Sequence, residues 1–322
     1  MFIPGSNDPA QLDLAMRASL AASLDHVYSK VGSRLGVSAS EAESTIANIR
    51  QHRVRPGTFG RYYKLVLAIE SGDFPRAQDL SRQIAALVQF KAEFCVALLT
   101  EAELGDEKRI YTELIDPDPA DAPWLLPPPA DDKFTEKVGR ALELIQTIDE
   151  ALADELRGLV LEIIGASPYH GPNSRPFGSA SSLMLWGMML INLERYQTAQ
   201  DLIQGIIHEA AHLLLFAHSI AEPLVTNPIS ERYTSPLRSD PRPMDGVFHA
   251  TFVSARMYYV THRLREATTV DFAPIPVDQL DERLAMLRQF YFGGLQTVQK
   301  YGKLTPIGEQ IMEETLAYMK AA

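Results

Sequence analysis

The residues of this chain most able to do chemistry stand in the stretch IIHEAAHLLL, which begins at Ile206. His208, Glu209 and His212 form the pattern HExxH, which many zinc peptidases use to hold a metal ion. In a helix, two residues four positions apart lie about 40° from each other around the axis and about 6 Å along it. His208 and His212 can therefore present two imidazoles to one ion, while Glu209 points to one side of it.

The residues around this motif predict a buried helix. Apolar side chains cover nearly its whole circumference: Leu202, Ile203, Ile206, Ile207, Leu213, Leu214, Leu215 and Phe216. Two histidines and a glutamate on such a helix need partners, because uncompensated burial of polar groups costs several kcal/mol. A metal ion is the simplest partner, although HExxH also occurs by chance on amphipathic helices.

Several downstream residues compete to be the third ligand. His218 has the spacing of the metzincin pattern HExxHxxGxxH, but Leu215 stands where that pattern has the glycine that turns the chain. If the helix continues, His218 lies about 9 Å beyond His212 and about 120° round the axis, so we assign it to the helix end. His249, near the start of the next predicted helix, is the better candidate. Three carboxylates stay open as alternatives: Glu231, Asp240 and Asp245.

A second motif accompanies HExxH. The segment RSDPRPMDGVFH has the pattern R-x-D-x-R-P-x-x-G-x-x-H, with Arg238, Arg242, Gly246 and His249 at its marked positions. This pairing resembles the HExxH proteins encoded beside ribosomally made, modified peptides. The similarity extends over about residues 197–263. The family is a set of iron- and 2-oxoglutarate-dependent hydroxylases that act on the β-carbon of residues in a precursor peptide.

The resemblance implies a role for each matched residue. His208, His212 and His249 would be the metal ligands, and Arg242 or Arg238 would bind the co-substrate. A guanidinium suits the distal carboxylate of 2-oxoglutarate because it can bind a carboxylate through two parallel hydrogen bonds. Arg242 is favoured because prolines on both sides stiffen its backbone. Three histidines depart from the usual set of two histidines and a carboxylate.

Two other functions stay open at this point. In a zinc metallopeptidase, Glu209 would be the catalytic general base that takes a proton from metal-bound water. An oxygenase needs no such base, so Glu209 would there orient a ligand, a water or the peptide. The chain could also be a helical scaffold with a structural metal or none, although structural zinc sites usually contain cysteines.

Composition limits the partners. The chain has 322 residues, with 41 acidic against 30 basic side chains and a formal net charge of -11. This balance argues against a general nucleic-acid binder. With one cysteine, Cys95, no intramolecular disulfide can form. No signal peptide or apolar run of about 18 residues is evident, so we expect no membrane partner and a cytoplasmic protein. The oligomeric state is left open.

Helical periodicity dominates the pattern of the chain. It predicts helices over residues 11–30, 39–51, 59–69, 75–103, 134–164, 197–217, 246–266, 278–301 and 306–320. Ser38 and Glu41 form a capping box, and Pro75 suits a first helical turn. The short apolar run SLMLWGMMLIN predicts a strand. The turn-rich loop around His170 could line a cleft, although a surface position is the simpler interpretation.

These elements predict a fold that is mainly α with a small β element. Its zincin-like active-site helix would pack against a second, ligand-bearing helix. We expect a helical N-terminal region (1–115), a Pro-rich linker or strap (116–132) and a metal-binding catalytic region (133–322), which could form one compact unit with the N-terminal helices. The proline content of the segment DPDPADAPWLLPPPADD marks the break, because proline cannot continue a helix.

Overall fold

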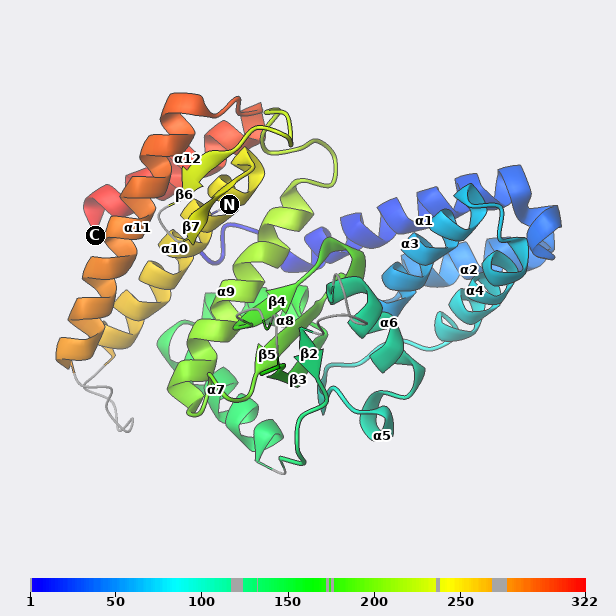
Figure 1. The fold of residues 1–322 in the computed structure, drawn as a ribbon, viewed down its shortest axis with the longest axis horizontal. Coiled ribbons are helices and arrows are strands. Elements are labelled where there is room, and N and C mark those ends of the chain that lie inside the picture. The colour runs from blue at the N-terminus through cyan, green and yellow to red at the C-terminus, as the bar shows by residue number, and fades with distance from the viewer. Residues whose placement is uncertain are drawn as a thin grey trace. The chain divides into compact units, whose positions relative to one another are not determined.

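The computed structural model describes residues 2–116, 124–131, 133–171, 174, 177–235, 238–267 and 277–322. Within these ranges the chain forms twelve α-helices and a small mixed sheet, which confirms the prediction of a mainly α fold with a small β element (Figure 1). None of the helices in the described ranges is both long and apolar enough to span a membrane.

The chain divides into two compact units, each assembled from separate segments. The first unit comprises Met1–Asp8, Gly139–Leu156 and Thr198–Ala322, and the second comprises Pro9–Val138 and Arg157–Gln197. Of the predicted regions, 1–115 contributes mainly to the second unit, and 133–322 contributes to both. In the predicted strap 116–132, residues 117–123 and 132 lie outside the described residues.

The first part of the second unit is mainly helical. Its helices are α1 (Pro9–Leu35), α2 (Ala39–Gln51), α3 (Pro56–Glu70), α4 (Phe74–Leu87), α5 (Glu101–Leu104) and α6 (Asp106–Ile115). The capping box predicted for α2 is present, since the Ser38 hydroxyl accepts a hydrogen bond from the Glu41 amide and the Glu41 carboxylate accepts one from the Ser38 amide. Pro75 lies in the first turn of α4, as predicted.

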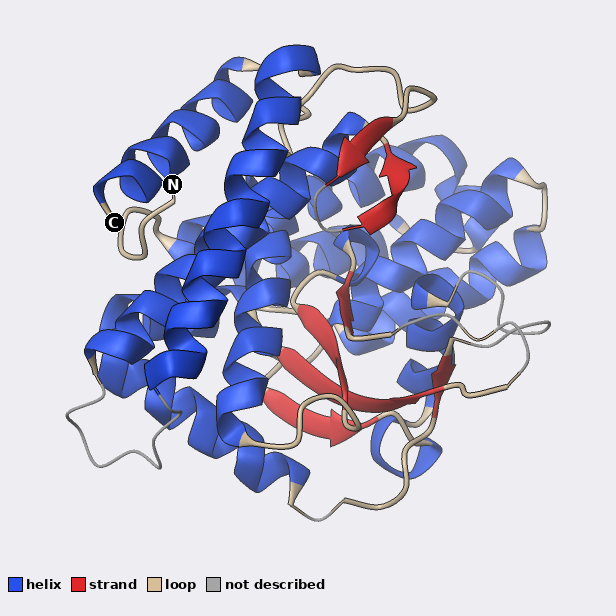
Figure 2. Cartoon of the chain, turned by 60° about the vertical axis from the view of Figure 1, so that its left-hand side comes forward, coloured by secondary structure: helices blue, strands red, loops and turns tan. Residues whose placement is uncertain are grey.

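The sheet of the second unit has parallel strands at its centre (Figure 2). Its strands are β1 (Cys95–Leu98), β2 (Leu125–Leu126), β3 (Glu162–Pro168), β4 (Ser179–Ser181) and β5 (Met188–Asn192). The order is β1-β3-β5-β4, with β2 paired to β3 off this path. The strands β1, β3 and β5 are parallel, whereas β2 and β4 run antiparallel to their neighbours.

Two predicted helices are wrong in their second halves. The predicted helix 75–103 ends with α4, and β1 follows it. The predicted helix 134–164 divides into α7 (Phe134–Ile148), α8 (Glu150–Leu159) and the start of β3, with the Asp149 side chain accepting a hydrogen bond from the Leu152 amide at the start of α8. Strands that are buried on both faces are continuously apolar, and periodicity cannot separate such a run from a buried helix.

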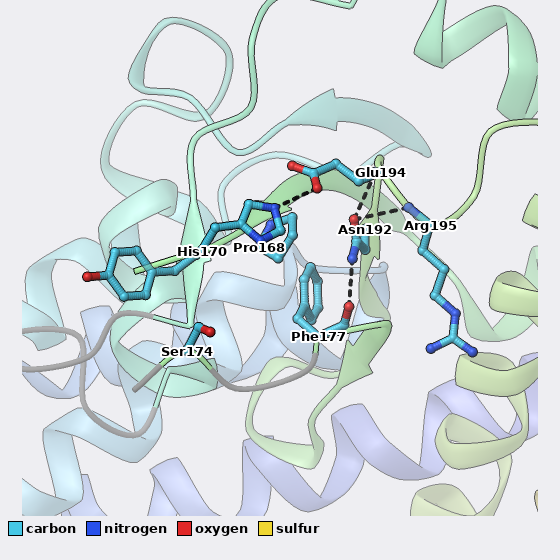
Figure 3. Close-up of a pocket in the computed structure, with 8 residues that line it drawn as sticks. Pro168, His170, Ser174, Phe177, Asn192, Glu194 and Arg195 are labelled. Atoms are coloured by element: carbon cyan, nitrogen blue, oxygen red, sulfur yellow. Dashed lines mark hydrogen bonds and ion pairs between the residues drawn. The ribbon is translucent and has the colours of Figure 1, made fainter. Parts of the chain in front are cut away.

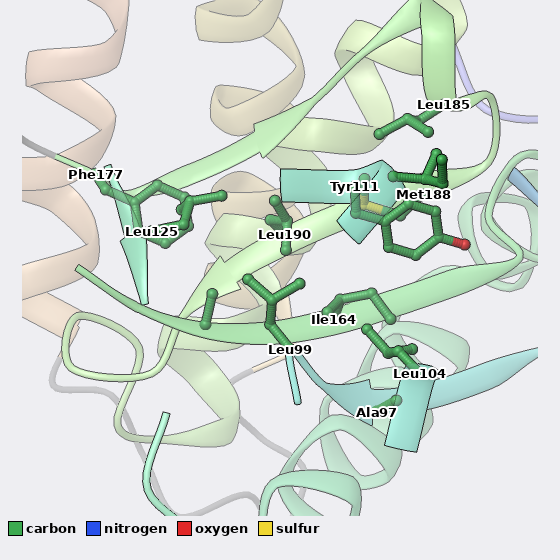
Figure 4. Packing of buried hydrophobic residues seen from close by; sticks show 12 residues of the cluster. Ala97, Leu99, Leu104, Tyr111, Leu125, Ile164, Phe177, Leu185, Met188 and Leu190 are labelled. Atoms are coloured by element: carbon green, nitrogen blue, oxygen red, sulfur yellow. The ribbon is translucent and has the colours of Figure 1, made fainter. Parts of the chain in front are cut away.

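The strand predicted in SLMLWGMMLIN is confirmed for its second half, β5. The first half forms a 3-10 helix, Leu183–Leu185, and Gly187 then takes a positive φ of 86°, which favours glycine. Buried side chains from both sequence segments of this unit pack over the sheet in one cluster (Figure 4), which includes Ala97, Leu99, Tyr111, Ile164, Leu185 and Leu190. This cluster holds β1, β3 and β5 together.

The first unit carries the remaining elements. They are most of α7 and α8, then α9 (Ala199–His218), β6 (Tyr233–Ser235), β7 (Arg238–Arg242), α10 (Met244–Glu266), α11 (Val277–Tyr301) and α12 (Pro306–Ala321). Helix α10 packs against α9, α11 and α12. The last four helices agree closely with the predicted ranges. The hairpin β6–β7 lies between the predicted helices 197–217 and 246–266, where no strand was predicted.

Candidate metal centre on helices α9 and α10

Three contacts give the register of α9 against α10. His212 meets His249, His208 meets Met257, and Gln204 meets Thr261. The residue number falls along α9 as it rises along α10, so the two helices run antiparallel. Helix α9 begins at a capping box, in which Thr198 accepts a hydrogen bond from the Asp201 amide. The helix continues unbroken through Leu215, as the sequence predicted.

His212 and His249 form the centre of the site. Their Nδ1 atoms lie 3.0 Å apart, and their rings are nearly parallel, with centroids 5.2 Å apart and an interplanar angle of 20°. The Phe216 ring lies against both, with its centroid 6.3 Å from that of His212 and 5.5 Å from that of His249. The structure therefore brings one residue of HExxH against the histidine predicted as third ligand.

Both of these imidazoles are neutral near pH 7. Burial lowers the pKa of His212 to about 3, while the Glu209 carboxylate raises it and the charges of His208, His249 and Arg242 lower it. Burial also lowers the pKa of His249 to about 4. Neutral imidazole is the form that binds a metal ion. Without a cation, the two facing nitrogens can only share one proton, with one nitrogen donating to the other.

His208 is close to this pair but oriented differently. Its ring centroid lies 5.1 Å from that of His212, but its Nδ1 lies 3.4 Å from the Met257 sulfur and its Nε2 lies 3.9 Å from a Glu209 oxygen. About a third of its side chain is exposed, so its ring has access to solvent. The structure thus places His208 beside the site, with its nitrogens on other partners.

Glu209 is buried, with 2% of its surface exposed. It lies on the same helix as the two histidines, and its charge acts on His212 in the direction that favours the imidazolium. A buried carboxylate with this field would also attract a cation held by the histidines. The structure therefore places Glu209 on the same helix as His208 and His212, and its role beside a metal ion stays a prediction.

The segment before α10 places Arg242 near the site. Arg242 ends β7, where it pairs with Tyr233, and its Nε lies 3.7 Å from Asp240 Oδ2. Its side chain runs over Gly246, because a Cβ added to that glycine would lie 3.6 Å from Cβ and Cδ of Arg242. Its charge lowers the pKa of His212, so it acts within electrostatic range of that ring. Arg238 lies at the start of β7, and its side chain is outside the described part of the structure.

The other proposed ligands lie elsewhere. His218 is the last residue of α9, as predicted, and burial lowers its pKa to about 4. Glu231 accepts hydrogen bonds from Tyr233 and Asn227. Asp240 lies beside Arg242, and Asp245 Oδ1 is 3.8 Å from His249 Nε2, whereas His212 faces His249 Nδ1. These carboxylates are not part of the histidine pair.

Sequence reasoning missed Met257 and Phe216 as parts of the site. Phe216 follows His212 by one helical turn, so the spacing alone could have placed it on the same face. Met257 is two turns beyond His249 on α10, and only the antiparallel register of α9 and α10 brings it to His208.

The donor set fits a metal ion in part. Two nitrogens that are each about 2.1 Å from one ion and at about a right angle lie about 3 Å apart, which is the separation found between His212 and His249. In the described part of the chain, however, no three His, Cys, Asp or Glu side chains have the arrangement of a metal site. The fit therefore extends to two ligands, and His208 would have to turn from Met257 to provide the third.

Neither the protein-family models nor the curated proteins compared with the chain match it. The geometry of α9 and α10 therefore carries the functional argument, together with the motif.

Proposed function

We propose that this chain is an iron(II)- and 2-oxoglutarate-dependent oxygenase that hydroxylates a side-chain β-carbon in a ribosomally made precursor peptide. The observation that carries the proposal is the pair of neutral imidazoles, His212 and His249, whose Nδ1 atoms lie 3.0 Å apart on two packed helices. The charge of Arg242 beside this pair gives further support.

Each residue has a distinct role in this proposal. His212 and His249 would hold the iron, and His208 would be the third ligand. Three protein ligands would leave room at the iron for a 2-oxo acid and dioxygen, and the iron would supply the oxidation chemistry that hydroxylation needs. The low pKa values of His212 and His249 keep both rings available as ligands over the neutral pH range.

Arg242 would bind the distal carboxylate of 2-oxoglutarate. Its side chain is one-third exposed, and Gly246 gives it a path over the first turn of α10. A bidentate guanidinium contact of this kind is worth about 1.5–3 kcal/mol. The glycine and the arginine of the second motif would thus act together. Alanine fits at Gly246, whereas a larger side chain would displace Arg242.

Glu209 has a supporting role in this proposal. It is buried beside the histidines, and its charge favours a cation there. It would orient the ligands, and no proton transfer depends on it. Glu209→Gln should therefore lower turnover only partly.

The decisive experiment is an anaerobic titration. Metal-free protein is loaded with iron(II), 2-oxoglutarate is added, and the visible spectrum is recorded. A charge-transfer band that appears in the wild type, and that needs a several-fold higher 2-oxoglutarate concentration in Arg242→Ala, supports the proposal. The matched control is Arg232→Ala, which removes an exposed arginine of the same connection.

The opposite result would also be informative. If no charge-transfer band appears and the protein retains zinc tightly, the oxygenase proposal is overturned and the zinc metallopeptidase is favoured. Glu209 would then be the general base, and Glu209→Gln should remove nearly all peptide hydrolysis while zinc stays bound.

A further inference from the structure

The second unit contains a cleft that the proposed function does not use (Figure 3). It has a volume of about 380 Å³ and lies at the carboxyl ends of the parallel strands β3 and β5. Ligands of open α/β sheets bind at this edge. Its lining comes from two short segments after these strands, one around His170 and one around Glu194.

Asn192 fixes the shape of this cleft. It is the last residue of β5 and is 5% exposed. Its Nδ2 donates to the Phe177 carbonyl at 2.6 Å, and its Oδ1 accepts from the amides of Glu194 and Arg195 at 2.8 and 3.3 Å. With every polar atom of a buried amide engaged, the turn after β5 is held in one conformation. Glu194 and Arg195 leave this turn in opposite directions (Figure 3).

One side of the cleft offers hydrogen-bond acceptors. His170 Nε2 lies 2.7 Å from Glu194 Oε2, and both side chains are at least half exposed. When Nε2 carries the proton, it donates to the carboxylate, and Nδ1 is left with a lone pair. The second carboxylate oxygen of Glu194 is an acceptor too. This side therefore suits a cationic donor such as an ammonium group.

The other side offers a cation. None of the ion pairs between described residues includes Arg195, and its guanidinium carbon lies 5.6 Å from the centroid of the Tyr196 ring. Its side chain lies over Gly178, because a Cβ on that glycine would be only 2.8 Å from Arg195 Nη1. A guanidinium that has no ion pair is suited to bind a carboxylate, through two parallel hydrogen bonds.

An apolar surface lies between these two groups. Phe177 is 5% exposed and packs edge-on against Trp124, and Pro168 ends β3 beside it. A simple acid would pair with Arg195 but bring its negative charge near that of Glu194, and a simple amine would pair with Glu194 but leave Arg195 without an ion pair among the described residues. A ligand that carries both charges satisfies both sides.

We propose that this cleft binds a small zwitterion, either an α-amino acid or a dipeptide with both ends free. The ammonium group pairs with Glu194 and His170, the carboxylate pairs with Arg195, and an apolar side chain lies on Phe177 and Pro168. The volume is in the range of small-molecule sites and has room for either ligand. The site lies wholly in the second unit, so it stands independently of the proposed function.

The first test compares ligands on the wild-type protein. Binding of L-phenylalanine, N-acetylphenylalanine, phenylalaninamide and a phenylalanine-containing dipeptide is measured by calorimetry and by NMR shifts. We expect one of the two zwitterions to bind, and each capped form to bind about tenfold more weakly or worse, because each lacks one charged hydrogen-bond partner. Whichever of the amino acid and the dipeptide binds with the higher affinity identifies the class of ligand that the cleft takes. Equal binding of capped and free forms, or no saturable binding at millimolar concentrations, would overturn the proposal.

The second test assigns the charges to residues. Arg195→Ala should abolish the preference for a free carboxylate, and Glu194→Gln should abolish the preference for a free amine. Gly178→Ala should weaken binding several-fold without removing either charge, because its Cβ displaces the guanidinium. The matched control is Arg82→Ala, which removes an exposed arginine of α4 paired with Asp79. If Arg195→Ala does not fold, Arg195→Lys replaces it and should lower the affinity for the free carboxylate. Unchanged preferences in folded variants would contradict the assignment.

Discussion

At the scale of the residue, His212 and His249 are two neutral bases whose nitrogens face each other. One shared proton satisfies both, and so does one shared cation. In the first case a substitution costs a hydrogen bond, of about 1 kcal/mol. In the second case the substitution removes a metal ligand. A metal titration of the variants therefore distinguishes the two cases, because only the second predicts a lower metal affinity.

We predict that His212→Ala and His249→Ala each weaken iron(II) or zinc binding by more than the roughly 10- to 100-fold that is typical of an outer-shell substitution. His208→Ala should lose as much, because a bound ion would draw its ring away from Met257. Equilibrium titration against a chelating indicator measures these affinities. His218→Ala is the control and should bind as the wild type does. Wild-type affinity in His208→Ala would mean that two histidines suffice.

A second prediction concerns His218, which is outside the histidine pair. Burial lowers its pKa to about 4 in the folded chain, while the unfolded value is near 6.5. The unfolded state therefore binds more protons in this window, and the contribution of His218 to stability is lost as the pH falls from about 6.5 to about 4. His218→Leu should make the free energy of unfolding fall less steeply over this range.

Urea denaturation of the wild type and of His218→Leu at several pH values between 7 and 4.5 measures this difference. The same substitution at exposed His26 serves as the comparison. Parallel curves for the wild type and His218→Leu would contradict the assignment of the pH dependence to His218.

At the scale of the element, the sequence predicted helices better than strands. The ranges of α2, α9, α10 and α11 follow from apolar spacing and capping residues. The strands β1 and β3 could not be recognised, because their segments show no polar–apolar alternation and periodicity gives no sign of a sheet. Burial on both faces comes from distant parts of the chain, and no local pattern records it.

The site shows the same limit. HExxH places His208, Glu209 and His212 on one helix. The connection to the next helix is long enough for that helix, which carries His249, to pack against the first. The orientation of the His208 ring could not be predicted. It depends on Met257, which reaches that ring only through the antiparallel register of α9 and α10.

The packing of α10 on α11 gives a prediction at this scale. A Cβ added to Gly294 would lie 2.2 Å from Thr251 Oγ1, and that hydroxyl donates to the Val247 carbonyl. Gly294→Ala should destabilise the protein by about 1–2 kcal/mol, because overpacking exceeds the gain in helix propensity. Gly139→Ala is the matched control. Nothing lies within 4 Å of its added Cβ, so it should stabilise the protein by about 0.5–1 kcal/mol. Thermal unfolding monitored by circular dichroism measures both, and equal melting temperatures would contradict the prediction.

At the scale of the whole molecule, each unit depends on segments that are far apart in sequence. In the first unit, buried Glu155 of α8 pairs with buried Arg256 of α10, and Asp149 accepts a hydrogen bond from Tyr259. In the second unit, β1 from the first hundred residues is a direct neighbour of β3. The chain therefore passes between the units several times, and one cut cannot separate them.

This connectivity predicts the behaviour of the fragment 133–322, which contains every proposed metal ligand. Without β1, the edge of β3 loses its parallel partner, and Ile164 and Leu190 lose the cover of Ala97, Leu99 and Tyr111. Burial of an apolar side chain is worth about 1.5–3 kcal/mol, so the loss of several such contacts is comparable to the stability of an ordinary domain, about 5–15 kcal/mol. We expect the fragment to show poorly dispersed amide resonances, weak near-ultraviolet dichroism and no tight metal binding, whereas mixing it with a fragment 1–132 should restore all three. A fragment 133–322 that folds alone and binds metal as the full chain does would show that the histidine pair needs no part of the second unit before residue 133.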